Sequence, residues 1–394
     1  MEQDPIVIIG YARTPMGGFQ GALSTATAPS AVAVAVKAAV ARAKVDPALI
    51  ERIYMGCVLP AGLGQAPARQ IAIGAGLPNS VEATTVNKMC GSGMQAIIMG
   101  AEALAAGAVD FVVTGGTESM SNAPFLLPKH RAGARIGHDR VIDSMMMDGL
   151  EDAYDAGKPM GAFAEDAATA YQFTRDEQDA YALRSLDRAR AAIDQGAFEK
   201  EIVPVEVKTR QGVTLVSIDE QPGNAKPEKI PTLKPAFAQP GTITAASSAS
   251  ISDGAAALVL TRASVAARLG LVPIATVGGQ GAHAQAPADF TTAPVPAIRK
   301  ALDAAAWSID EVDLFEVNEA FAVVPMIAMR ELGIPADKIN VNGGATALGH
   351  PIGASGARIV ATLLAALEAR GGRKGVASLC IGGGEATAVA LELA

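Results

Sequence analysis

Two cysteines and one histidine of this chain stand in glycine-rich segments, where reactive side chains can lie close to exposed backbone. Cys90 is followed by Gly-Ser-Gly, Cys380 by Ile-Gly-Gly-Gly, and His350 lies between Gly349 and Gly353. The chain has only three cysteines and four histidines, so this concentration is not expected by chance. Two thiols and an imidazole are groups suited to acyl transfer through a covalent thioester.

The setting of Cys90 predicts a nucleophile rather than a buried structural thiol. Apolar residues recur at helical spacing after it, so a helix is expected to begin there and to end near Gly107. Free backbone N–H groups and the helix dipole favour a thiolate at such a position. Cys57 has no comparable setting and is expected to be ordinary core, and Met145–Met147 is expected to serve packing or an interface.

Three further side chains complete the candidate site. His350 is expected to take the proton of Cys90 and then to hydrogen-bond a thioester oxygen, although it could be a plain loop histidine. Cys380 ends an apolar run, so it is either a core residue or an acid/base whose pKa a neighbour lowers. Asn318 could cap an expected helix, or its amide could hold a water or a carbonyl. The other histidines show no metal-ligand spacing, so no metal is expected.

The composition narrows the class of protein. The 394 residues suffice for two or three layered domains, and 50% hydrophobic with only 4% aromatic residues suits helices packed closely on buried sheets. A net charge of −8 argues against nucleic acid. Three cysteines without disulfide spacing indicate reduced thiols and a cytoplasmic location. A signal peptide and an apolar run of about 18 residues are both lacking, so no membrane span is expected. Neither a dinucleotide fingerprint nor a P-loop occurs.

The chain predicts alternating strands and helices with one insertion. Strands are expected at 5–10, 53–55, 82–86, 111–115, 255–260, 274–277, 313–317, 339–341, 376–380 and 387–393. Helices are expected at 28–43, 175–193, 294–305 and 355–369, after Cys90 and from Asn318. The charged stretch 120–250 indicates an inserted subdomain. Val-Asn, glycines, a helix and a strand recur after residues 86 and 341, which predicts two related α/β halves with the reactive groups between them.

Four motifs together resemble those of thiolases, in the same order and along the whole chain. They are Asn-Lys-Met-Cys90-Gly-Ser-Gly-Met, Asn318-Glu-Ala-Phe, Gly349-His350-Pro-Ile-Gly-Ala-Ser-Gly and Cys380-Ile-Gly-Gly-Gly. The resemblance implies an α/β thiolase-like fold of two related five-layered α/β/α/β/α halves. The first half would be 1–119 with 252–272, the inserted loop domain 120–251, and the second half 273–394. It also implies a homotetramer, a dimer of dimers, or at least a tight dimer.

The resemblance assigns a role to each reactive residue. It implies a reversible Claisen condensation of two acetyl-CoA to acetoacetyl-CoA and coenzyme A, without a further cofactor. Cys90 would carry the acetyl group, His350 would activate it, and Cys380 would remove the α-proton of the second acetyl-CoA. His350 and a water held by Asn318 would form one oxyanion hole. The N–H groups of Cys90 and Gly382 would form the other.

The substrate-binding residues are likewise implied by the resemblance. They are Met160, Ala236, Phe237, Ala245, Ala249, Ser250, Ala320 and Phe321. The chain departs from the family pattern at three positions: Pro159 replaces a histidine, Ala249 a serine, and Gly223 an arginine. Ser250, and the lysines 226 and 229, stand close enough to compensate, so the departures bear on coenzyme A affinity rather than on the chemistry.

Three alternatives stay open at this point. A degradative 3-ketoacyl-CoA thiolase of broader chain length would carry the same four motifs. A ketosynthase acting on a carrier protein would not need a second thiol. A non-catalytic lipid carrier of the family is expected to lose one member of the set, and this chain keeps all of them.

Overall fold

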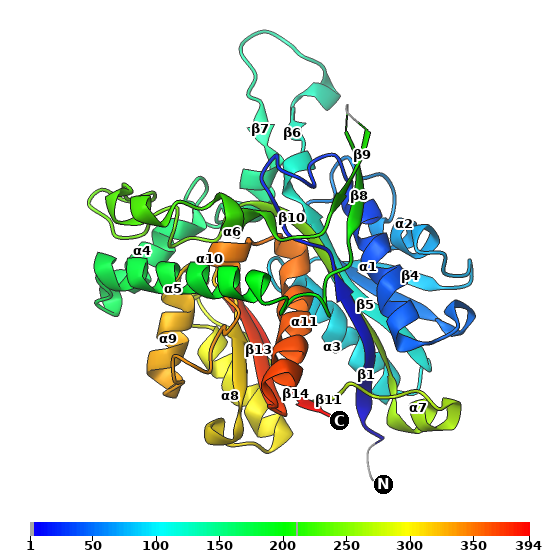
Figure 1. Cartoon of the computed structure of the whole chain (residues 1–394). Helices are drawn as coiled ribbons and strands as arrows, with labels where there is room; N and C mark the ends of the chain where they lie inside the picture. Colours follow the sequence, from blue (N-terminus) through cyan, green and yellow to red (C-terminus); the bar gives the residue numbers. More distant parts are fainter. Residues whose placement is uncertain (1–3, 210–211) are drawn as a thin grey trace.

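A computed structural model describes residues 4–209 and 212–394, and a long twisted sheet runs through the molecule (Figure 1). Residues 1–3 and 210–211 lie outside the described residues. The strand order is β12-β13-β14-β11-β1-β10-β5-β3-β4. In the first half the elements are β1 (Ile6–Arg13), α1 (Ala28–Ala43), β3 (Arg52–Gly56), α2 (Pro67–Gly74), β4 (Glu82–Val86), α3 (Ser92–Ala105), β5 (Phe111–Ser119) and β10 (Ser252–Arg262). In the second half they are β11 (Ala275–Ala284), α8 (Pro294–Ala305), β12 (Leu314–Val317), α9 (Val323–Leu332), α11 (Ile352–Arg370), β13 (Lys374–Ile381) and β14 (Glu385–Leu393).

The two halves repeat one topology, as the weak sequence repeat predicted. β3 pairs parallel with β5, and β10 pairs antiparallel with both β5 and β1. In the same way β12 pairs parallel with β13, and β14 pairs antiparallel with both β13 and β11. β1 and β11 pair with each other where the halves meet. The predicted strand at 339–341 is wrong, because only isolated bridges form there, from Ile339 to Phe315 and from Val341 to Gly343.

Five layers run through the whole chain, and the sequence predicted this α/β layering. α1 covers β1 and β10 on one outer face, and α8 covers β11 and β14 on the other. α11 lies between the two halves, because it contacts β5 and β10 of the first half as well as β12 and β13 of the second. α3 packs against α11 in the same central layer (Figure 1).

Small residues let the two central helices approach closely. A Cβ added to Gly356 would clash with the backbone of Met94, and one added to Gly93 would lie 2.9 Å from the backbone nitrogen of Ala357. α11 is long and apolar enough to cross a membrane by composition, but 89% of its most apolar window is buried inside the protein, as in a core helix. The close crossing brings the N-terminal ends of α3 and α11, and thus Cys90 and His350, to one place.

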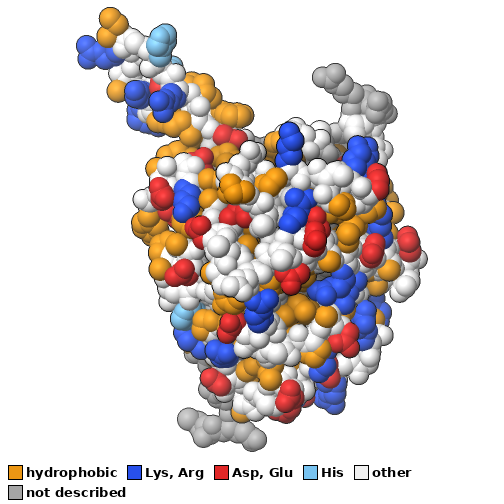
Figure 2. All heavy atoms as spheres, turned by 90° about the vertical axis from the view of Figure 1, so that its left-hand side faces the viewer, with side chains coloured by type: hydrophobic (Ala, Val, Ile, Leu, Met, Phe, Trp, Pro, Cys, Tyr) orange, Lys and Arg blue, Asp and Glu red, His pale blue; other side chains and the backbone are white. Residues whose placement is uncertain are grey.

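Residues 120–251 lie between the paired strands β5 and β10 and form a mostly helical subdomain. Its main elements are α4 (Met160–Ala170), α5 (Arg175–Asp194), α6 (Glu220–Asn224), the hairpin β8–β9 (Val205–Thr209, Gly212–Val216) and an arm built on β6 (Phe125–Leu126) and β7 (Ile142–Asp143). The arm projects from the body of the molecule (Figure 2). Thr174 is the N-cap of α5 and forms a capping box with Glu177. This local signal explains why the predicted helix 175–193 agrees with the structure.

Candidate active site

Cys90 stands in a strained turn that ends against β13. Met89, directly before it, has φ +46°, a left-handed conformation that is costly for a side chain of this kind. A Cβ on Gly91 would clash with Ile381, so the turn can lie this close to β13 only with glycine there. An ion pair between Lys88 and Glu385 also ties the turn to the second half.

The backbone around Cys90 supplies two hydrogen-bond donors. The N–H groups of Cys90 itself and of Gly382 both stabilise its thiolate form. Burial nevertheless outweighs them and raises the pKa of Cys90 to about 11. The expectation that the helix end favours a resting thiolate is therefore wrong, because the desolvation penalty exceeds the gain from the N–H groups. The two donors point to where the oxygen of an acyl group on sulfur would lie.

His350 is held by its backbone and by one ring nitrogen. Its N–H donates to the Ser250 carbonyl at 3.1 Å, and Nδ1 lies 2.6 Å from the Ser355 hydroxyl oxygen. Because that hydroxyl donates to the Pro351 carbonyl at 2.9 Å, it must accept from Nδ1, which therefore carries the ring proton. Nε2 is then the basic nitrogen, and it has no hydrogen-bond partner among the described residues.

His350 is uncharged in this setting. Burial, and then the positive charge of Arg358, lower its pKa to about 3. A neutral imidazole with a free Nε2 lone pair can accept a proton, which a structural, fully bonded loop histidine could not.

Cys380 ends β13 with its side chain 1% exposed. Burial, and then the charge that Cys90 would carry, raise its pKa well above the ordinary value. The N–H of Gly382, two residues after Cys380, also reaches the Cys90 sulfur, so both thiols lie in the same site. The prediction that a neighbour lowers the pKa of Cys380 is wrong, because no cation faces it in the described structure and burial dominates. Cys57 is buried core, as predicted, and its thiol donates to Glu118 at 3.6 Å.

Asn318 lies in a loop and not at a helix start. The helix predicted from Asn318 begins only at Val323, and its first residue has no side-chain cap, so the capping interpretation is wrong. The neighbouring Glu319 anchors the loop by accepting hydrogen bonds from Tyr181, Ser185 and other groups across the subdomain boundary. The Asn318 amide nitrogen lies 3.5 Å from Nδ1 of His350. The Asn318-Glu-Ala-Phe motif thus places the Asn318 amide beside the His350 imidazole.

Several predicted substrate-binding side chains gather beside the thiols. Met160 is the first residue of α4 and its thioether lies within 3.8 Å of the position where Gly382 would carry a Cβ. Phe237 packs edge-on against Phe321 at a ring-centroid distance of 5.8 Å. Ala320 and Cys380 belong to the same buried cluster, which Met160 and Phe237 flank. The N–H of Ala236 donates to the Ile243 carbonyl, which holds this loop in place.

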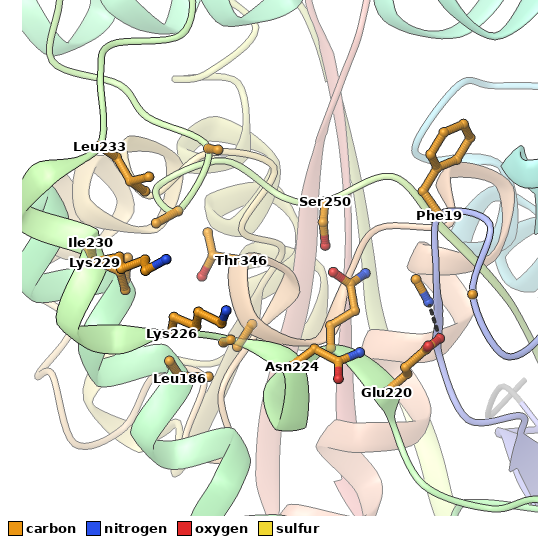
Figure 3. A pocket seen from close by; sticks show the side chains of 18 residues that line it. Phe19, Leu186, Glu220, Asn224, Lys226, Lys229, Ile230, Leu233, Ser250 and Thr346 are labelled. Carbon is orange, nitrogen blue, oxygen red and sulfur yellow. Dashed lines mark hydrogen bonds between the residues drawn. The ribbon is translucent and has the colours of Figure 1, made fainter.

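A cavity of about 480 Å³ lies at the inserted subdomain (Figure 3). Ala245 and Ser250 line it, and the Ser250 carbonyl binds the His350 backbone N–H, so the cavity wall adjoins the main chain of His350. The side chains of Lys226 and Lys229 reach into it, and neither has an ion-pair partner within 4.0 Å among the described residues. Ala249 is not part of its lining, because its N–H is turned to the Ala320 carbonyl at 2.9 Å.

Three buried polar residues near the site were not predicted to serve it. Ser355 lies within the histidine motif given above, and Arg358 follows it. The sequence signal that could have identified them is a polar side chain in an otherwise apolar central helix. Glu118 accepts backbone N–H groups of Val58 at 2.9 Å and of Gly353 at 2.9 Å, so it holds the start of α11 against the first half. Burial raises the pKa of Glu118 to about 7.

Two thiols, a neutral imidazole and paired N–H donors on a doubled α/β fold define an enzyme of covalent acyl transfer. The family models "Thiolase, N-terminal domain" and "Thiolase, C-terminal domain" match residues 6–264 and 271–393. The chain is 51% identical to acetyl-CoA acetyltransferase 2 of Arabidopsis thaliana (98% of this chain, 97% of that one) and 45% identical to acetyl-CoA acetyltransferase of Schizosaccharomyces pombe (100% of both). Among solved structures, acetyl-CoA acetyltransferase of Bacillus anthracis matches with TM-score 0.96 and 38% identity (100% and 99% of the chains). The Acat5 thiolase of Ascaris suum in complex with coenzyme A matches with TM-score 0.94 and 42% identity (99% and 100%). The chain belongs to the thiolase family, which confirms the resemblance.

Proposed function

We propose that the protein is an acetyl-CoA C-acetyltransferase, which condenses two acetyl-CoA reversibly to acetoacetyl-CoA and coenzyme A. The observation that carries this proposal is the pair of neighbouring thiols, one of which faces two backbone N–H groups. One thiol can hold an acyl group while the other handles a proton. The names of the relatives support the same activity.

In the first half-reaction Cys90 becomes acetylated. Its S–H bond breaks as the proton passes to Nε2 of His350, and the sulfur attacks the acetyl-CoA carbonyl carbon. The N–H groups of Cys90 and Gly382 stabilise the oxyanion, since preorganised donors in a buried site need no reorganisation. Coenzyme A then leaves as the thiol and takes the proton.

In the second half-reaction the proton of Cys380 first passes to the neutral His350, and the Cys380 thiolate so formed removes the α-proton of a second acetyl-CoA. The raised pKa of Cys380 makes that thiolate a strong base. The enolate oxygen is stabilised by His350 and by a water held on the Asn318 amide. The carbanion attacks the acetyl carbon on Cys90, the Cys90 thiolate leaves, and the imidazolium of His350 returns a proton to Cys90, which restores the starting state with both thiols protonated.

The cavity in Figure 3 suits a coenzyme A thioester. Lys226 and Lys229 would attract the phosphates of its nucleotide part and compensate for the arginine that Gly223 replaces, while Ser250 would hydrogen-bond the pantetheine arm next to His350. The fit of this cavity supports a free coenzyme A thioester over a carrier-protein substrate, as does the presence of Cys380.

The arm on β6 and β7 supports an oligomer. It exposes Phe125, Leu127 and Ile136, with 67%, 45% and 104% of their surface accessible, and the arm that carries them projects away from the body (Figure 2). We assign the arm to contacts between copies of the chain in a homotetramer. Reduced thiols at the site suit a cytoplasmic location.

The acyl preference is tested with thiolysis of purified protein. The expected result is a kcat/KM for acetoacetyl-CoA at least about tenfold above that for 3-ketodecanoyl-CoA. Equal or better use of the longer substrate would instead assign a degradative 3-ketoacyl-CoA thiolase. Absence of thiolysis with both would contradict the proposed function.

A further inference from the structure

We infer that Arg358 is a positioning residue that fixes the Asn318 side-chain amide, with its oxygen turned to the guanidinium and its NH₂ turned to His350. This inference rests on the proposed function, in which the Asn318 amide holds the water that donates to the enolate oxygen. Arg358 touches no substrate, and it acts through Asn318.

The placement of Arg358 is not explained by the stability of the fold. It lies in α11 with 0% of its surface exposed, and its nearest carboxylate, on Glu316, is 3.8 Å away. Two of its nitrogens, Nε and Nη1, have no hydrogen-bond partner among the described residues, nor has Oε1 of Glu316. Burying a loosely paired ion is costly, and an apolar side chain would fill the same space at lower cost.

Within residues 4–209 and 212–394, the side chain of Arg358 makes one hydrogen bond, and it goes to Asn318. Its Nη2 lies 3.4 Å from the amide oxygen Oδ1. A guanidinium has donors only, so it binds the oxygen and not the nitrogen of an amide. The amide nitrogen is thereby turned to the other side, where it lies 3.5 Å from Nδ1 of His350. Because Nδ1 carries the ring proton and donates to Ser355, it cannot accept from the amide, so this is a contact and the orientation depends on Arg358.

The backbone alone would not set this orientation. The Asn318 N–H donates to the Ser378 carbonyl at 2.9 Å, which fixes the main chain, but the terminal torsion of asparagine is broad and nearly two-fold. Without Arg358 the amide could turn its oxygen towards the site. An amide oxygen in that place would take one of the two protons of the bound water, whereas the NH₂ group leaves both protons free to donate to the developing enolate oxygen.

The charge of Arg358 also acts on His350. It contributes to the lowered pKa that keeps the imidazole neutral. The charged groups that face Arg358 are Glu316, Arg13, Glu201 and Glu319. Loss of the guanidinium should therefore raise the pKa of His350 and move the acid limb of kcat/KM to higher pH.

A double-mutant cycle between Arg358→Met and Asn318→Ala tests the inference in the full-length enzyme. Thiolysis of acetoacetyl-CoA and acetylation of Cys90 by acetyl-CoA are measured separately. We expect Arg358→Met to lower kcat of thiolysis by about tenfold or more with KM changed by less than about threefold. The double variant should be no slower than Asn318→Ala alone, because both changes remove one function.

Arg42→Met is the matched control. Arg42 is likewise an arginine that donates to main-chain or side-chain oxygens, in its case the carbonyls of Tyr11, Glu201 and Ile202, but these lie outside the site. It should leave kcat within about twofold and should not shift the acid limb. If the two reductions in kcat multiply in the double variant, Arg358 and Asn318 act independently and the inference is overturned.

Arg358→Lys keeps the test decisive if Arg358→Met does not fold. Lysine keeps the charge but lacks the fork that reaches Oδ1, so kcat should fall while the acid limb stays in place. An unchanged kcat in Arg358→Lys contradicts the inference. If the unmodified enzyme has no thiolysis activity, the proposed function itself fails, whereas an active enzyme with independent Arg358 and Asn318 effects refutes the positioning role alone.

Discussion

The hydroxyl oxygen of Ser355 lies 2.6 Å from Nδ1 of His350 and decides which ring nitrogen is basic. Since the hydroxyl proton is used on the Pro351 carbonyl, the imidazole proton sits on Nδ1 and the lone pair on Nε2. The partners of this hydroxyl, His350 and Pro351, directly precede α11, and Ser355 lies in its first turn. One short segment therefore sets both the position and the tautomer of the base.

Ser355→Ala should therefore slow the enzyme without unfolding it. Loss of the acceptor on Nδ1 frees the ring to rotate or to change tautomer, and we expect kcat of thiolysis to fall by about tenfold or more, part of the 10²–10⁴ that a positioned base contributes. Steady-state kinetics and thermal unfolding are the measurements. Thr261→Val, which removes another buried hydroxyl that donates to a carbonyl at 2.7 Å, is the control and should leave kcat unchanged. Equal losses in the two variants would contradict the role of Ser355.

The reactive residues and most elements could be predicted from the sequence, because turns rich in glycine and regular apolar spacing are local signals. The roles of Arg358 and Glu118 were not predicted, because each role depends on a residue that is distant in the sequence. Arg358 donates to Asn318, and Glu118 accepts from Val58. The predicted pKa of Cys90 was wrong for a related reason. The helix end is visible in sequence, but the burial that outweighs it comes from the packing of both halves.

The two thiols should separate the two half-reactions. Cys380→Ser should still become acetylated at Cys90 but should fail in condensation, because a hydroxyl is far too weak a base for the α-proton. Cys90→Ala should lose both steps. Mass spectrometry after incubation with acetyl-CoA locates the adduct, and an adduct on Cys57 or Cys380 in the unmodified enzyme would refute the assignment. Cys57→Ser serves as the control for loss of a thiol.

The reactivity of Cys90 should rise steeply with pH. Burial raises its pKa to about 11, so the thiolate fraction in the resting enzyme should increase about tenfold per pH unit between pH 7 and pH 10. The rate of inactivation by iodoacetamide, with and without protecting acetyl-CoA, measures this. A plateau of the rate near pH 7 would mean that the resting nucleophile is a thiolate.

Lys226→Gln and Lys229→Gln should weaken binding without slowing the chemistry. We expect KM for acetoacetyl-CoA to rise about two- to fivefold for each, as for an exposed ion pair, with kcat unchanged. The effect should shrink at high salt and vanish with acetoacetyl-pantetheine, which lacks the nucleotide. Lys234→Gln, on the same segment but outside the cavity lining, is the control. A rise in KM for the pantetheine substrate would place the lysines elsewhere in recognition.

Ser250 should supply the hydrogen bond that the family pattern places at residue 249. Its hydroxyl is buried in the cavity wall and has no partner among the described residues, whereas the Ala249 backbone is committed to Ala320. Ser250→Ala should raise KM for acetoacetyl-CoA by roughly 2- to 12-fold, the equivalent of about 0.5–1.5 kcal/mol. Ala249→Ser is the matched variant and should leave KM unchanged or slightly raised, because a second hydroxyl would find no free acceptor there. A lower KM in Ala249→Ser would mean that the lost serine contact is not replaced, and that Ser250 serves the His350 loop rather than the substrate.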